Sequence, residues 1–135
     1  MIYFAIYIRY NIGMARGYQE KEKTLSLQRA KEIVEKNWAG IKVMDVSDFS
    51  NKGFFNEGLF KLITEDGRGL ALKGYGDKFR VVSFLDKARK FLLTNNFNNL
   101  AEVKTTNSGL DYYCDQNNYY VLSGWIEGPS LAEVD

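Results

Sequence analysis

The chain has 135 residues, which is enough for one domain with a buried core but not for two. Hydrophobic residues make up 45% of it and charged residues 26%, a balance that predicts an ordered domain. The formal net charge is +1, so no strong field is available to attract nucleic acid or an anionic membrane, and we expect neither as a partner.

The chain contains no histidine and one cysteine, Cys114. Without histidine, Ser-His-Asp triads, imidazole general bases and imidazole metal ligands are excluded. A single cysteine excludes an intramolecular disulfide and a multi-cysteine metal site, and we expect no resident metal. We interpret Cys114 as a small strand residue, with a reactive thiol as the alternative. We expect a cytoplasmic location because nothing indicates export.

Residues 1–8 are apolar but too few to span a bilayer. No basic region precedes them and no small-residue cleavage motif follows, so a signal peptide is not expected. They form either an added edge strand or sequence upstream of a later start at Met14, and both interpretations stay open. We assign residues 1–25 to an amino-terminal extension, an edge strand or linker, and residues 26–135 to the domain itself.

The first periodic segment, residues 26–38, predicts an amphipathic helix. Apolar side chains recur in it at three- and four-residue steps. They are Leu27, Ala30, Ile33, Val34 and Trp38. Ser26 precedes them as an amino-terminal cap, and Gly40 supplies the left-handed residue that ends the helix.

Three strands follow. Alternating or β-rich runs predict them at residues 41–46, 59–64 and 69–74. Residues 48–58, between the first two strands, contain turn formers with Gly53 and Gly58 and predict a loop. Residues 65–68 join the second and third strands, and their Asp-Gly pair favours a hairpin turn.

The longest helical pattern covers residues 77–95. Its apolar stripe consists of Val81, Phe84, Leu85, Ala88, Phe91 and Leu92. Two further strands are predicted near 110–114 and 119–125, joined by a polar turn. We interpret their four tyrosines as paired strand aromatics, not as a stacking platform: Tyr112, Tyr113, Tyr119 and Tyr120.

The chain ends with a capping-box spacing at residues 130–133, where a new helix would begin. The predicted order is helix, strand, glycine loop, hairpin, long helix and hairpin. It favours an α+β domain, in which an antiparallel sheet of about five strands is crossed by one long helix and accompanied by an amino-terminal helix.

Three segments then carry a resemblance to a known family. Residues 64–73 end in Leu-Ala-Leu-Lys, residues 84–97 continue the long helix, and residues 118–128 run into Ser-Gly-Trp-Ile-Glu-Gly. In this order they resemble the amino-terminal lobe of the aminoglycoside-phosphotransferase and choline-kinase superfamily. The resemblance extends from about Leu27 to Glu133 and is strongest to the spore-coat protein S (CotS-type) kinase-like proteins. It adds association with spores to the expected location.

The resemblance implies a protein-kinase-like lobe with a site for ATP, which is weak when the lobe is alone. Lys73 would contact the α- and β-phosphates, for which a compact ammonium on a flexible stem is suited. Gly53 and Gly58 would let their loop approach the phosphates closely, because they have no Cβ. Asp77 would be the helix acid that steadies Lys73, although the helix macrodipole alone also favours an acid there.

The resemblance also implies an adenine site at the hinge that follows the last strand. Backbone groups of the hinge would hydrogen-bond the base, and the residues concerned are Ser123, Gly124, Trp125 and Ile126. The expected apolar walls of the adenine slot are Val46, Leu59, Ala71 and Leu122.

Phosphoryl transfer needs further residues, namely an aspartate that orients the attacking hydroxyl and an asparagine and aspartate that hold Mg²⁺. In the superfamily these lie in the carboxy-terminal lobe, and this sequence stops just beyond the hinge. We therefore assign no catalytic residue to the chain, expect Mg²⁺ only together with a second lobe, and expect no kinase activity from the chain alone.

Three hypotheses of function remain. The first is the nucleotide-binding lobe of a truncated phosphotransferase-like protein. The second is a non-catalytic interaction module, spore-coat-like, that pairs with a separate lobe or forms a homodimer through Trp125, Ile126 and Leu131 or through residues 1–8. The third is an unrelated α+β domain, for example a cystatin-like layer. The acceptor of the phosphate cannot be deduced, because the missing lobe builds its pocket.

Overall fold

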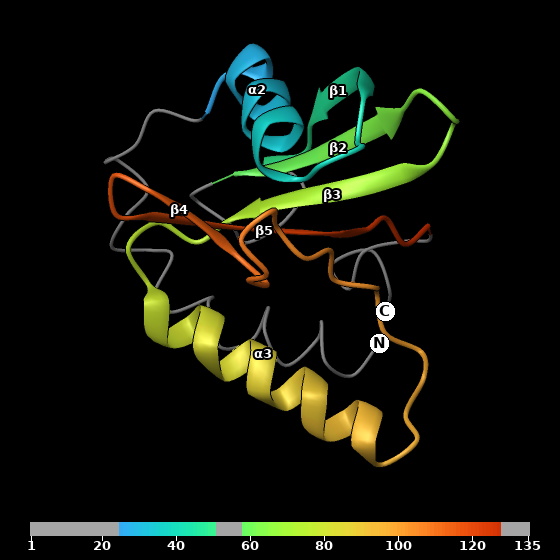
Figure 1. The fold of residues 1–135 in the computed structure, drawn as a ribbon, viewed down its shortest axis with the longest axis vertical. Helices are drawn as coiled ribbons and strands as arrows, with labels where there is room; N and C mark the ends of the chain where they lie inside the picture. The colour runs from blue at the N-terminus through green and yellow to red at the C-terminus, as the bar shows by residue number, and fades with distance from the viewer. Residues whose placement is uncertain (1–24, 51–57, 128–135) are drawn as a thin grey trace, which may run out of the picture.

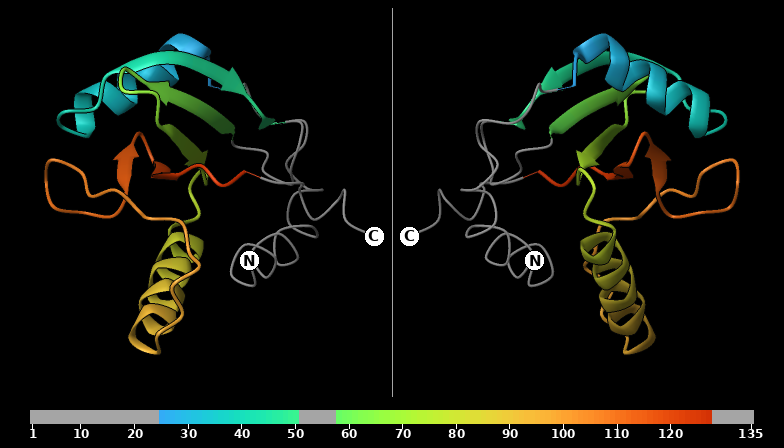
Figure 2. Two further views of the ribbon diagram at one scale, coloured as in Figure 1. Left: turned by 90° about the vertical axis from the view of Figure 1, so that its right-hand side faces the viewer. Right: turned by 90° about the vertical axis from the view of Figure 1, so that its left-hand side faces the viewer.

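The computed structural model describes residues 25–50 and 58–127. The elements are α2 (Leu27–Asn37), β1 (Val43–Asp48), β2 (Leu59–Thr64), β3 (Gly69–Gly74), α3 (Phe79–Thr94), β4 (Tyr113–Asp115) and β5 (Asn118–Gly124). The strands form one antiparallel sheet in the order β1-β2-β3-β5-β4. Helix α2 packs on one side of this sheet and α3 lies on the other (Figures 1 and 2). This confirms the predicted α+β architecture.

The predictions for residues 1–24, for Gly53 and for the capping box at 130–133 lie outside the described residues. Within the described residues, neither helix is long and apolar enough to cross a membrane.

Helix α2 begins and ends as its sequence predicts. The side chain of Ser26 accepts a hydrogen bond from the Arg29 backbone N–H at 3.1 Å, which satisfies a donor of the first turn. Gly40 adopts φ 79° just beyond the helix, a conformation that side chains with a Cβ rarely adopt. Ala30, Ile33 and Val34 are buried against the sheet.

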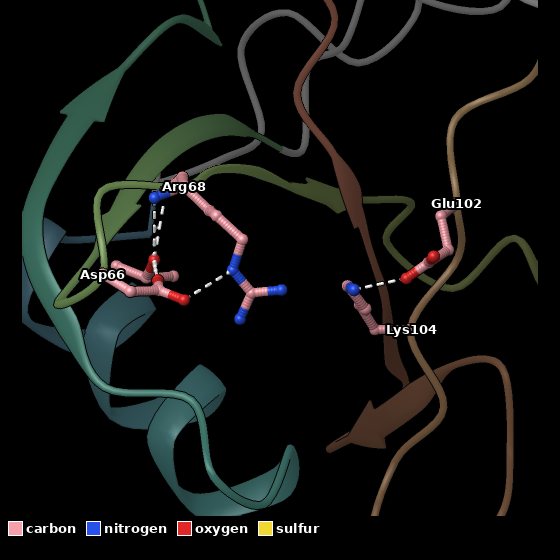
Figure 3. Close-up of polar contacts among 5 residues, drawn as sticks. Asp66, Arg68, Glu102 and Lys104 are labelled. Carbon is pink, nitrogen blue, oxygen red and sulfur yellow. Dashed lines mark hydrogen bonds and ion pairs between the residues drawn. The ribbon is translucent and has the colours of Figure 1, made fainter.

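The β2–β3 hairpin matches the prediction at both strands. The backbone N–H of Thr64 donates to the Arg68 carbonyl at 2.9 Å, and Gly67 has φ 84°. Asp66 tightens the turn, because its carboxylate accepts from the Thr64 hydroxyl and from Arg68 Nε, the latter at 2.9 Å (Figure 3). The hydroxyl of Thr64 and the charge of Arg68 lower the pKa of Asp66, so the turn is held by an ionised carboxylate.

The two faces of the sheet carry separate hydrophobic clusters. The cluster under α2 contains Trp38, Phe60, Leu62, Leu70, Leu72 and Leu122, all buried. The cluster on the α3 side contains Leu59, Ala71, Tyr75, Val81, Val82 and Leu85. Because side chains alternate along a strand, neighbouring residues of β3 belong to different clusters.

Helix α3 differs from its prediction at its start and in its orientation. It begins at Phe79 and not at Asp77, because the preceding residues form a turn in which the Lys78 N–H donates to the Tyr75 carbonyl at 3.2 Å. Val82 is buried, whereas Phe84 and Phe91 are 55% and 66% exposed. The prediction that these two phenylalanines are buried is therefore wrong. Helix α3 faces the sheet with the side that carries Val81, Val82 and Leu85.

The second hairpin joins β4 to β5 through Gln116 and Asn117, both with positive φ. Tyr113 stacks on Tyr120 across the strands with ring centroids 6.3 Å apart, which confirms this pair as strand aromatics. Tyr112 lies just before β4, and its ring centroid is 5.7 Å from that of Tyr119, whose strand partner is Cys114. Cys114 lies exposed in β4.

One pairing partner of β5 has no counterpart in the predicted elements. Residues 102–104 run beside the second half of β5, where the Lys104 N–H donates to the Leu122 carbonyl at 2.8 Å and the Gly124 N–H donates to the Glu102 carbonyl at 2.9 Å. The indole Nε1 of Trp38 donates to the Lys104 carbonyl at 3.1 Å and joins this segment to α2. Lys104 also pairs with Glu102 and lowers its pKa (Figure 3).

The cluster under α2 should dominate stability. Phe60 is 1% exposed, and Phe60→Ala should lower the free energy of unfolding by about 3–5 kcal/mol because it leaves a cavity. Met44 provides the control, because it is 65% exposed in the neighbouring strand. Met44→Ala should change the free energy of unfolding by less than about 0.5 kcal/mol. Urea denaturation measures both, and equal losses would contradict this core.

Candidate nucleotide-binding face

The candidate site lies on the α3-side face of the sheet, hereafter the Lys73 face. Lys73 is near the end of β3, between Leu59 of β2 and Val121 of β5. Leu59 and Val121 belong to the α3-side cluster. The lysine is half-buried, and desolvation lowers the pKa of its ammonium to about 8. Strand alternation puts Lys73 on the same face as Ala71, and its contact with phosphates stays a prediction.

The other end of the Lys73 face is built by the segment after β5. The backbone N–H of Trp125 donates to the Gly69 carbonyl at 3.0 Å, which extends the β3–β5 pairing by one bond. The Trp125 ring meets Phe49 edge to face, with centroids 5.0 Å apart and planes at 66°. Lys61 Nζ lies 5.0 Å from the centroid of the Trp125 ring and 3.1 Å from the Glu127 carboxylate.

The hinge residues are brought beside β3, but part of their backbone is already used. Ser123 is buried opposite Ala71, and the N–H groups of Gly124 and Trp125 donate to Glu102 and Gly69. Ile126, the last residue of the expected hinge, is 44% exposed. The sequence does not predict these internal bonds.

Two of the four residues that were expected to line the adenine slot lie on the opposite face of the sheet. Leu59 and Ala71 belong to the cluster of the Lys73 face. Leu122 is buried in the cluster under α2, and Val46 packs against that same cluster. The correction follows from strand alternation: Leu122 is the neighbour in sequence of Val121, so it points to the opposite face.

Asp77, the expected acid partner of Lys73, is exposed in the turn before α3, and its role beside Lys73 stays a prediction. The turn carries the side chain outwards because the helix starts two residues later than the sequence predicts. Gly58 is required where it stands: its φ is 120°, and a Cβ would lie 2.9 Å from the ring of Phe60.

A charged cluster fixes α3 to the segment before β4. Arg89 Nη2 contacts Asp86 at 3.0 Å and Asp111 at 3.3 Å, and Lys90 contacts Asp86 at 2.8 Å. Burial opposes ionisation of Asp86, but hydrogen bonds from Lys90 and Arg89 outweigh it and lower the pKa of Asp86. In the sequence, the only sign of this cluster is that Arg89 and Lys90 follow Asp86 by three and four residues, a spacing that brings side chains together on a helix. Arg89 and Asp111 also line a shallow hollow beside Val121.

No group of three or more potential metal ligands occurs among the described residues.

No protein-family model matches the chain, and no curated protein sequence does. Its fold is similar to that of a solved aminoglycoside phosphotransferase from Alicyclobacillus acidocaldarius, with a TM-score of 0.61 and 14% sequence identity. The match covers 82% of this chain and 30% of that chain. The fold is therefore that of a kinase-like amino-terminal lobe, and it spans less than a third of the phosphotransferase.

The depressed pKa of Lys73 has a consequence for stability. Between pH 8 and pH 10.5 the unfolded chain retains the lysine proton that the folded chain has released, so the free energy of unfolding rises with pH in this window. In Lys73→Met this contribution is absent. The free energy of unfolding of wild type, minus that of the variant, should therefore rise with pH across this window. The rise should be at most about 3 kcal/mol, because one pKa unit corresponds to 1.36 kcal/mol.

Urea denaturation of both proteins at steps between pH 7 and pH 10.5 measures that difference. Other titrating groups cancel because both proteins share them. A difference that stays constant across the window would mean that Lys73 is fully hydrated.

Proposed function

We propose that the chain is the nucleotide-binding lobe of a small-molecule phosphotransferase-like protein of the aminoglycoside-phosphotransferase and choline-kinase superfamily, of the CotS type, and that it binds ATP weakly. The observation that carries the proposal is the position of Lys73. Its ammonium lies on the face that also holds Ala71 and the residues after β5, where burial disfavours the charged form of the lysine. A polyphosphate beside the ammonium would favour the charged form.

The fold supports this proposal because the similar structure is that of a phosphotransferase. Kinases hold ATP with a strand lysine on the phosphates and a hinge on the base. In this chain the loop at Gly58, Lys73 and the backbone of Ile126 would fill these roles. The hydrogen bonds already made by Gly124 and Trp125 leave fewer hinge donors for a base, which is consistent with weak affinity.

ATP should stabilise the folded chain. A ligand that binds only the folded state raises its stability by about 2.7 kcal/mol at 100 times Kd, so Tm should rise by several degrees at saturating ATP. Lys73→Ala should abolish the rise. Lys42→Ala is the charge-matched control, because Lys42 is an exposed lysine before β1, and it should keep the rise. A rise that persists in Lys73→Ala would exclude the phosphate role.

Catalysis by the chain alone should be negligible. Transfer requires Mg²⁺ and an aspartate beside the acceptor hydroxyl, and the described residues contain no group of three or more potential metal ligands. Incubation with ATP, Mg²⁺ and either amino sugars or choline should give ADP at the background rate. Turnover clearly above that background, retained after repurification, would contradict the assignment of chemistry to a second lobe.

A non-catalytic interaction module, spore-coat-like, is the second candidate. The observation that favours it is the exposure of Phe84 and Phe91 on α3, since exposed aromatic surface promotes association with another lobe or another copy. The two functions differ in their response to ATP. A chain that associates through α3 but gains no stability from ATP would support the module instead of the nucleotide-binding lobe.

A further inference from the structure

Trp125 lies back over the sheet at the end of the Lys73 face opposite to Lys73. Its backbone bonds to Gly69, and a Cβ placed on Gly69 would come 3.2 Å from the Cβ of Trp125. Glycine at this position therefore allows the tryptophan to approach the strand closely. The indole packs with the cluster that contains Leu59 and Ala71, which are the two expected slot walls found on this face.

Two side chains hold the indole in this place. Phe49 contacts the ring edge to face, a favourable arrangement for an aromatic pair. The ammonium of Lys61 lies within cation–π range of the same ring. Lys61 also pairs with Glu127, so the chain just after Trp125 is tied to the lysine that contacts its ring.

The indole N–H opposes this packing. Nε1 of Trp125 is buried, and no acceptor among the described residues takes its hydrogen. A buried donor without a partner destabilises the state that contains it. The closed position of Trp125 is thus favoured by ring contacts and disfavoured by its polar atom, which is the balance expected of a contact that opens.

The spacing along β3 sets the distance between the indole and Lys73. Gly69 and Lys73 are four residues apart on one strand, about 13 Å at roughly 3.3 Å per residue. This separation is comparable to the length of an extended nucleotide between its base and its distal phosphates. A nucleotide with its phosphates at Lys73 would therefore bring its base to the place that the Trp125 ring fills.

We propose that Trp125 is an internal plug of the base site, and that a purine nucleotide binds by displacing the indole from Phe49 and Lys61. This inference rests on the proposed function. The plug lowers the apparent affinity by the fraction of molecules in which it is closed. It also makes the site selective for ligands whose planar ring can replace the indole against Phe49 and Lys61.

Calorimetric titration of the full chain with ATP tests the plug. Trp125→Ala should bind ATP roughly tenfold more tightly than wild type, a factor that corresponds to about 1.4 kcal/mol. Trp125→Leu, which keeps an apolar side chain without the ring, serves if Trp125→Ala does not fold. Leu27→Ala is the control, because it removes an exposed apolar side chain from α2 on the opposite face, and its affinity should equal that of wild type.

Tryptophan fluorescence gives an independent readout. The chain has two tryptophans, and Trp38 is buried under α2 with its Nε1 bonded to Lys104. Saturating ATP should shift the emission of wild type to the red as the Trp125 ring enters water, and Trp125→Phe should lose this shift.

Each outcome decides between the two proposals. Tighter binding in Trp125→Ala together with the red shift supports the plug. Equal or weaker binding in Trp125→Ala overturns it, and weaker binding identifies Trp125 as a stacking partner of the base while the proposed function stands. Absence of ATP binding in both wild type and Trp125→Ala overturns the proposed function and the plug with it.

Discussion

Strand β3 is paired on both sides, by β2 and by β5, and its side chains alternate between two buried layers. Leu70 and Leu72 enter the cluster under α2, where they are almost fully buried. Ala71 and Lys73 therefore have to lie on the opposite face, with α3. A lysine in the central strand of a covered sheet is costly to keep charged, and its depressed pKa expresses that cost. The rest of the candidate site is arranged around this lysine.

Helix α2, the segment 102–104 and the tight β2–β3 turn act as supports of that arrangement. The indole of Trp38 and the backbone of Lys104 connect α2 to β5, the strand that leads into Trp125. On the inner face, the pairs between Arg89 and the carboxylates of Asp86 and Asp111 hold α3. Helix α3 covers part of the Lys73 face with Val81, Val82 and Leu85, and the plug proposed at Trp125 closes the end opposite to Lys73.

Local signals made much of the fold predictable from the sequence. The hairpin of β2 and β3 follows from two apolar runs around an Asp-Gly pair, and α2 follows from its spacing and the Ser26 cap. The faces of β5 could not be predicted, because a strand buried on both sides has no polar alternation to show which side Leu122 takes. The pairing of residues 102–104 is a tertiary contact without a strand pattern of its own. The packing of Trp125 against Gly69 is also a tertiary contact, so the sequence pattern does not predict it.

The ammonium of Lys73 is proposed to contact a polyphosphate, and the protonation of that single group reports such a contact most directly. NMR of the chain with isotope-labelled lysine side chains, assigned through Lys73→Met, gives the pKa of Lys73 with and without ATP. We expect a pKa near 8 in the free protein and a clear rise when ATP binds, because a phosphate stabilises the charged form. A pKa that is the same in the presence and absence of saturating ATP would contradict it.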